Sequence, residues 1–132
     1  MTRFAIDSGV AFRLLREGAS VAANHSLVAP SLLRSEVLAR VYRSARQGEL
    51  SDRESRAMLD GLSALRIRLL GDRVSRATAW RIAEQLNWSE LGQAEYLAVA
   101  SLQADVFVTL DEHLAQQAAG IVPVAEYEAV LT

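Results

Sequence analysis

Short apolar runs alternate with longer segments of helical periodicity along this chain, and that alternation restricts the fold more than any other feature of the sequence. The clearest run is Val106–Val108, which is short, apolar and rich in β-branched residues, as strands are. Strands that alternate with helices form mainly parallel sheets, because parallel strands need crossover connections. The sequence therefore predicts an α/β fold with a central, mainly parallel sheet of about five short strands, flanked by helices on both faces.

The expected elements fill the chain without a repeat or linker that would divide it, so residues 1–132 are predicted to form one domain. The expected strands are residues 4–7, 27–29, 66–70, 106–108 and 121–124. The expected helices are residues 8–17, 30–47, 51–62, 75–86, 91–102 and 111–118, with a further short helix at the C-terminus. Gly18 and Gly48 are expected to end the first two helices, and Ser51 with Glu54 has the form of a capping box.

The composition favours a cytoplasmic protein that does not associate with membranes. No uncharged apolar run approaches the roughly 18 residues that a membrane span requires. Arg3 and Asp7 place charges too early for a signal peptide. The chain has no cysteine, which excludes a disulfide scaffold, a thiol nucleophile and a cysteine-ligated metal.

Charge is distributed unevenly along the chain. Residues 1–81 hold all 14 basic residues, each of them Arg, against 8 acidic residues, and so carry a net charge of +6. Residues 82–132 hold 8 acidic residues and no Arg or Lys, which gives −8. A basic segment can attract a polyanion. The alternative is that folding interleaves the two segments and cancels much of the difference.

Three acidic residues are predicted to lie at the carboxyl edge of the sheet, where open α/β sheets bind ligands. Asp7 ends the first strand, Asp111 follows the strand 106–108, and Glu36 lies in the helix after the second strand. Clustered carboxylates repel one another unless a cation neutralises them, and their oxygens suit Mg²⁺ or Mn²⁺. Equally, Asp7 and Asp111 are placed to cap helices, and Glu36 to pair with Arg40 one turn away. The residues alone leave both interpretations open.

Three stretches of the chain carry short motifs in a distinctive order. Ala5–Ser8 is a strand that ends in Asp and Ser, and Ala29–Val37 leads into a helix that carries a Glu. Ala94–Ala100 is a helical segment with Tyr-Leu-Ala, and Ala104–Asp111 is a hydrophobic strand followed by Thr-x-Asp. In this order and spacing the motifs resemble the PIN-domain family, particularly the VapC-like ribonuclease toxins of type II toxin–antitoxin systems. The resemblance covers nearly the whole chain.

This resemblance implies a single PIN-like domain that acts as a metal-dependent endoribonuclease. Asp7, Glu36 and Asp111 would be its catalytic residues and would hold Mg²⁺ or Mn²⁺, which activates water for hydrolysis of an RNA phosphodiester bond. Ser8 and Thr109 would support these acids through hydrogen bonds. The implied partners are a cognate antitoxin protein, an RNA substrate and a second copy of the chain in a homodimer.

One position departs from the family pattern. Where the family usually has an Asp, this chain has Gln93, whose amide offers a neutral oxygen but no charge. Either Gln93 or Glu90, which lies one turn earlier, is expected to complete the metal shell. The alternative is a weakened or inactive PIN-like module that binds RNA or an antitoxin without cutting.

Four arginines are candidates for contacts with RNA phosphates, because a guanidinium group can donate two hydrogen bonds to a phosphate at once. They are Arg13, Arg34, Arg40 and Arg43. A signalling domain of flavodoxin-like topology would also gather acids around Mg²⁺, but its phosphate chemistry uses a Lys, which this chain lacks.

Overall fold

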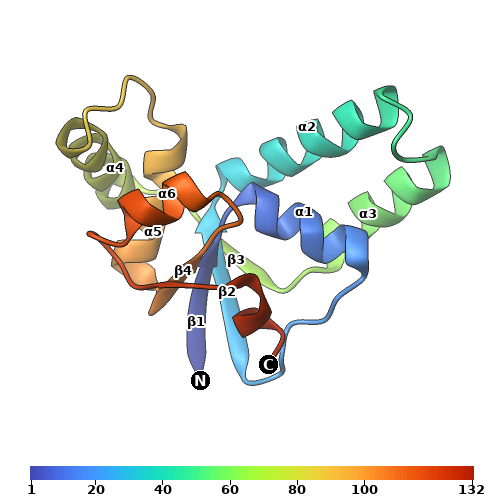
Figure 1. Ribbon diagram of the computed structural model, residues 1–132, viewed down its shortest axis with the longest axis horizontal. Coiled ribbons are helices and arrows are strands. Elements are labelled where there is room, and N and C mark those ends of the chain that lie inside the picture. The colour runs from blue at the N-terminus through green and yellow to red at the C-terminus, as the bar shows by residue number, and fades with distance from the viewer.

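The computed structural model describes all of residues 1–132 and contains a five-stranded sheet in which every pairing is parallel (Figure 1). The strand order is β3-β2-β1-β4-β5. The strands are β1 (Thr2–Ile6), β2 (His25–Pro30), β3 (Ile67–Leu70), β4 (Val106–Val108) and β5 (Val124–Ala125). The predicted α/β class and parallel sheet are confirmed.

The helices cover both faces of this sheet, as predicted. They are α1 (Ser8–Glu17), α2 (Leu32–Arg46), α3 (Asp52–Ala64), α4 (Arg73–Gln85), α5 (Gly92–Gln103), α6 (Glu112–Ala118) and a 3₁₀ turn, η1 (Tyr127–Val130). Parallel crossovers are right-handed, so the reversal of direction after β3 sends the later helices to the opposite face. Figure 1 shows α1, α2 and α3 on one side of the strands and α4, α5 and α6 on the other.

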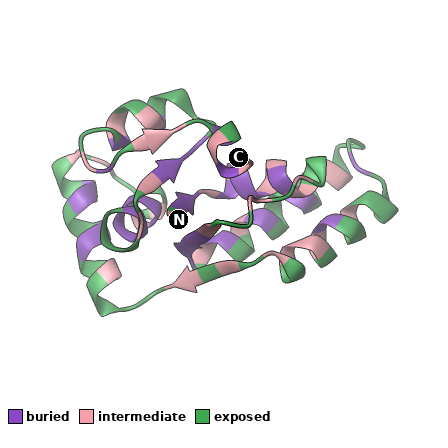
Figure 2. Ribbon diagram, turned by 90° about the horizontal axis from the view of Figure 1, so that it is seen from below, coloured by how far each residue is buried: buried purple, intermediate pink, exposed green.

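The core lies on both faces of the central strands, where the buried residues gather (Figure 2). Ile6, Ala29 and Phe107, from three neighbouring strands, have no exposed surface. Helix α5 packs across β1, β2 and β4 and is buried from Ala94 to Ala100 except at Glu95. Its alanines allow a close approach to the sheet, which holds this helix rigidly over the strands. None of the helices combines the length and the apolar character that a membrane span requires.

Several helix ends follow the predicted signals. Ser51 and Glu54 form the expected capping box at the start of α3. Gly18 ends α1 with a left-handed φ of 60°, a conformation that glycine adopts without strain. Gly48, with a φ of 78°, follows the end of α2.

Most element ends differ from the prediction by one to three residues, and two of these differences have a clear physical reason. Pro30 does not open a helix; it is the last residue of β2 and pairs with Leu70 of β3. Its missing N–H is tolerated because it stands at the strand's end. The last strand is not residues 121–124 either, since the N–H groups of Ile121 and Val122 both bond to the carbonyl of Ala118 and extend the turn after α6.

Candidate functional site

A cavity of about 590 Å³ opens at the carboxyl edge of the sheet, beside the ends of β1 and β4. These neighbouring strands lead into α1 and α6, which lie on opposite faces of the sheet. Such a switch point is where open α/β sheets bind ligands, because the departing chains leave a crevice between them. The volume is within the usual range for small-ligand sites.

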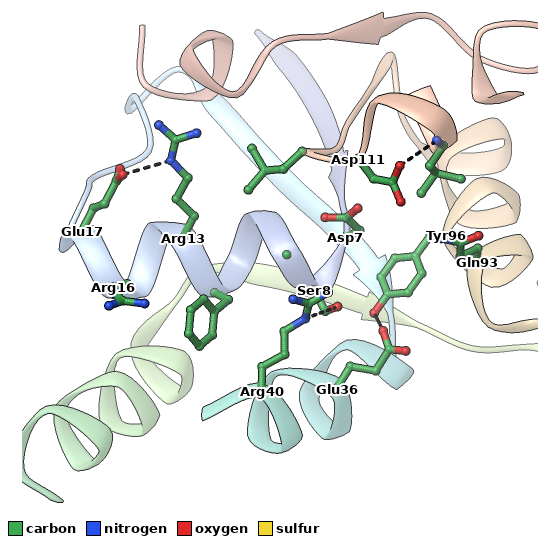
Figure 3. Close-up of a pocket in the computed structure, with 14 residues that line it drawn as sticks. Asp7, Ser8, Arg13, Arg16, Glu17, Glu36, Arg40, Gln93, Tyr96 and Asp111 are labelled. Carbon is green, nitrogen blue, oxygen red and sulfur yellow. Dashed lines mark hydrogen bonds and ion pairs between the residues drawn. The ribbon is translucent and has the colours of Figure 1, made fainter. Parts of the chain in front are cut away.

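All three acids predicted from the sequence line this cavity, and Gln93 lines it too (Figure 3). Asp7 directly follows β1, Glu36 is on α2, Asp111 follows β4 and Gln93 is on α5. The fold thus brings together side chains from both faces and from distant parts of the sequence. Their assignment as metal ligands stays a prediction.

Two of the acids also cap helices, as the alternative interpretation expected. Asp7 Oδ1 accepts a hydrogen bond from the N–H of Val10 at 3.0 Å, at the start of α1. Asp111 Oδ1 accepts one from the N–H of Leu114 at 3.1 Å, at the start of α6. Each cap uses one carboxylate oxygen, and Asp111 Oδ2 accepts no hydrogen bond from the protein. Capping and ligation are therefore compatible.

Asp7 is the most constrained of the acids. The hydroxyl of Thr109 donates to Asp7 Oδ2, and Thr109 Oγ1 in turn accepts the N–H of Asp111. Burial raises the pKa of Asp7, and the charge of Asp111 raises it further, although hydrogen bonds from Thr109 and Val10 and the charge of Arg40 act in the opposite direction. The net upward shift means that burial disfavours the charged form of Asp7.

Glu36 is held by a residue to which the sequence assigned no role. The buried Tyr96 of α5 donates its hydroxyl hydrogen bond to Glu36 Oε1, while Oε2 accepts none. Tyr96 lies one turn beyond Gln93, so this helical spacing was the available signal. The pair of Glu36 and Arg40, which the alternative interpretation offered, does not form. Arg40 Nε instead donates to Ser8 Oγ at 3.2 Å, which places Ser8 beside the acids as predicted.

The four candidate arginines separate into two groups. Arg13 and Arg40 line the cavity, whereas Arg34 and Arg43 are exposed on α2 away from it. Arg16 also lines the cavity and was missed, although it lies one turn after Arg13 on α1.

The arginines at the cavity differ in how strongly they are already engaged. Arg13 is paired with Glu17 at 3.0 Å, and its guanidinium carbon lies 4.0 Å from the centre of the Tyr127 ring. Arg16 has no ion pair or hydrogen bond through its side chain. Arg16 is therefore the cavity's least engaged cation, which leaves it free for an anionic ligand.

Glu90 does not line the main cavity. Helix α5 begins only at Gly92, so Glu90 belongs to the preceding loop and is not stacked one helical turn below Gln93. It lines a smaller neighbouring hollow, to which Glu36 and Gln93 also contribute.

Two solved structures have a similar fold. One is PAE2754 from Pyrobaculum aerophilum, with a TM-score of 0.72 and 19% sequence identity over 98% of this chain and 93% of that one. The other is VapBC-1 from nontypeable Haemophilus influenzae, with a TM-score of 0.62 and 12% identity over 95% of this chain and 98% of that one. The chain has a VapC-like PIN-domain fold. No protein-family model matches the sequence, and no curated protein matches it significantly.

The PIN-domain fold raises the question of whether these residues suit a divalent cation. The donors are three carboxylates and one amide oxygen, the hard oxygen ligands that Mg²⁺ and Mn²⁺ prefer. In their present positions no three His, Asp or Glu side chains come close enough to share one ion. Mg²⁺ needs no such cage, because it keeps several waters and binds through one or two carboxylates together with substrate phosphates. The donor set therefore fits.

Proposed function

We propose that this protein is a Mg²⁺- or Mn²⁺-dependent endoribonuclease and the toxin component of a toxin–antitoxin pair. One observation carries the proposal: Asp7, Glu36 and Asp111 come from three separate elements and line a single cavity at the switch point of a PIN-domain fold. Helix capping accounts for two of these acids but not for Glu36, which lies within α2 and caps nothing.

Asp7, Glu36 and Asp111 would hold the cation, one or two of them directly and the others through its bound waters. When bound, it supplies a water of lowered pKa and neutralises the charge that develops on the phosphodiester. The chain's own contribution is to fix the acids before any ligand arrives. The Thr109 hydroxyl and the N–H of Val10 hold the two oxygens of Asp7, so this carboxylate needs little reorganisation.

The arginines would bind and orient the RNA backbone. Arg40 uses only Nε in its bond to Ser8, which leaves its two terminal nitrogens available to a phosphate. Arg16 is exposed and makes no ion pair. We therefore rank Arg16 and Arg40 above Arg13, whose charge is already offset by Glu17.

The likeness to VapBC-1 supports a cognate antitoxin as the protein partner, and we propose a homodimer as the working form. Helix α4 carries two exposed apolar side chains, Val74 and Trp80, which a second copy could cover. Co-expression with the neighbouring reading frames tests the first proposal, and light scattering of the purified chain tests the second.

Cleavage of a labelled RNA by the purified protein in Mn²⁺ is the direct test of activity. Wild-type protein should cut, EDTA should stop the reaction, and Asp7→Asn should reduce the rate by at least about 100-fold, because ligand loss removes the cation. Cleavage that persists unchanged in Asp7→Asn would come from a contaminant and would leave the proposal without support.

A second candidate function is binding without cleavage, and Gln93 is the observation that favours it. Gln93 lines the cavity where the PIN-domain pattern expects a carboxylate, so the site has one charge fewer to offer a cation. Gln93→Asp separates the two functions. A wild-type protein that binds RNA but cuts only after this substitution is a binding module, whereas comparable cleavage by both forms indicates a complete native site.

A further inference from the structure

The three acids predicted as metal ligands differ in what holds their carboxylates in place. Asp7 and Asp111 are each fixed by a backbone N–H at the start of a helix. Glu36 has no such donor, because it lies within α2, where the backbone N–H groups serve the helix itself. Its sole donor in the protein is the hydroxyl of Tyr96 (Figure 3).

Tyr96 is well placed to hold the Glu36 carboxylate in position. It is 3% exposed, and its ring is packed within the core beneath the cavity. Helix α5 lies over one face of the sheet and α2 over the other, so the Tyr96 side chain reaches across the carboxyl edge to Glu36. A hydroxyl on a rigidly packed ring is a donor whose position is fixed by the core.

We propose that Tyr96 is a positioning residue for Glu36, an inference that rests on the proposed metal-dependent function. The Tyr96 hydroxyl engages Oε1 and leaves Oε2 of Glu36 for the cation. A free Glu side chain must lose rotamer freedom when it ligates, and this contact removes that cost in advance. The need is greater here because Gln93 adds no charge to the site.

The other interpretation is that the Tyr96 ring fills the core and that its hydroxyl simply uses the nearest acceptor. Tyr96→Phe separates the two, because it keeps the ring and removes only the donor. Tyr127→Phe is a matched control, since Tyr127 is also buried and donates to a glutamate, Glu17, at 3.0 Å.

The experiment measures Mn²⁺ affinity by titration calorimetry in the absence of RNA. Tyr96→Phe should bind Mn²⁺ roughly tenfold more weakly than wild type, the lower end of the loss expected for an outer-shell donor. Tyr127→Phe should match wild type. In a Glu36→Gln background, Tyr96→Phe should cause no further loss, because Tyr96 acts through Glu36.

Three results overturn the inference. Unchanged affinity in Tyr96→Phe reduces Tyr96 to a packing residue, and tighter binding shows that its hydroxyl competes with the cation. An equal loss in the Glu36→Gln background shows that Tyr96 acts by another route. Melting curves of each variant, recorded in EDTA, confirm that the protein compared is folded.

A wild-type protein that binds no Mn²⁺ overturns the proposed function instead. The contact is then judged in EDTA by a double-mutant cycle of wild type, Tyr96→Phe, Glu36→Ala and the double variant, through their unfolding equilibrium constants. Tyr96→Phe and Glu36→Ala should be coupled by about tenfold or more, as expected for a hydrogen bond to a charged group. Additive effects would show that Tyr96 does not hold Glu36.

Discussion

Replacing Asp7 by Asn and by Ala separates its structural role from its proposed chemical role. Asn keeps an oxygen for the N–H of Val10 and an amide group that can hydrogen-bond the Thr109 hydroxyl, but it removes the charge. Ala removes the charge and both contacts. Losing the cap costs about 1 kcal/mol, and leaving the Thr109 hydroxyl without its partner costs about 1 kcal/mol more.

Asp7→Ala should therefore unfold about 2 kcal/mol more easily than Asp7→Asn. With an unfolding entropy of about 2.1 cal/mol/K per residue over 132 residues, this difference corresponds to a melting temperature lower by about 7 °C. Urea denaturation at pH 7 in EDTA measures the free energy of unfolding of each variant. Equal slopes of this free energy against urea concentration confirm that the unfolded states are comparable. Both variants should fail to cleave RNA.

The upward pKa shift of Asp7 sets the pH dependence. Because burial makes the folded protein hold this proton more tightly than the unfolded chain does, wild-type stability falls as pH rises from the unfolded value of about 3.9 through the folded pKa. At pH 7 the full penalty is present, so Asp7→Asn should be more stable than wild type, and the advantage should vanish below the unfolded pKa. An Asp7→Asn protein that is less stable than wild type at pH 7, or no more stable than Asp7→Ala, would refute this reasoning.

Further predictions concern the cavity rim and the helix ends. Arg16→Gln should weaken RNA binding and should reduce by about 1 the slope of log affinity against log salt concentration, while Arg34→Gln should change neither quantity. Fluorescence anisotropy measures both affinities, and an equal loss of affinity in the two variants would contradict the placing of Arg16 at the RNA-binding rim of the cavity. Thr109→Val removes a hydrogen bond that lowers the pKa of Asp7, so Mn²⁺ binding followed against pH should begin at higher pH, and an unmoved onset counts against this contact. Gly18→Ala should cost about 1 kcal/mol in urea denaturation, and no loss would contradict the left-handed turn.

Much of the fold could be predicted because its signals are local. Val106–Val108 is a strand by composition alone, and Ser8–Glu17 is bounded by an acid that caps it and a glycine that ends it. Pro30 was misplaced because the same residue suits the first turn of a helix and the end of a strand. The pairing of β2 with β3 decides between them, and that pairing is not local.

The candidate site, like the fold, could be predicted from the sequence only in part. Asp7, Glu36 and Asp111 could be brought together from the sequence because strand ends of a parallel sheet share one edge. The role of Tyr96 could not be predicted, because it depends on a side chain that reaches from α5 to α2 at that edge. The failure of Glu36 to pair with Arg40 has a similar origin, because Ser8 competes for the guanidinium from another element.

Anomalous diffraction from crystals soaked in Mn²⁺ tests the central claim most directly. The proposed function predicts an anomalous peak within the cavity, with one or two of the carboxylates of Asp7, Glu36 and Asp111 as direct ligands, and absent from Asp7→Asn crystals grown in the same way. Ordered crystals whose peak lies elsewhere, or whose cavity holds no ion at saturating Mn²⁺, would contradict a metal-dependent nuclease at this site.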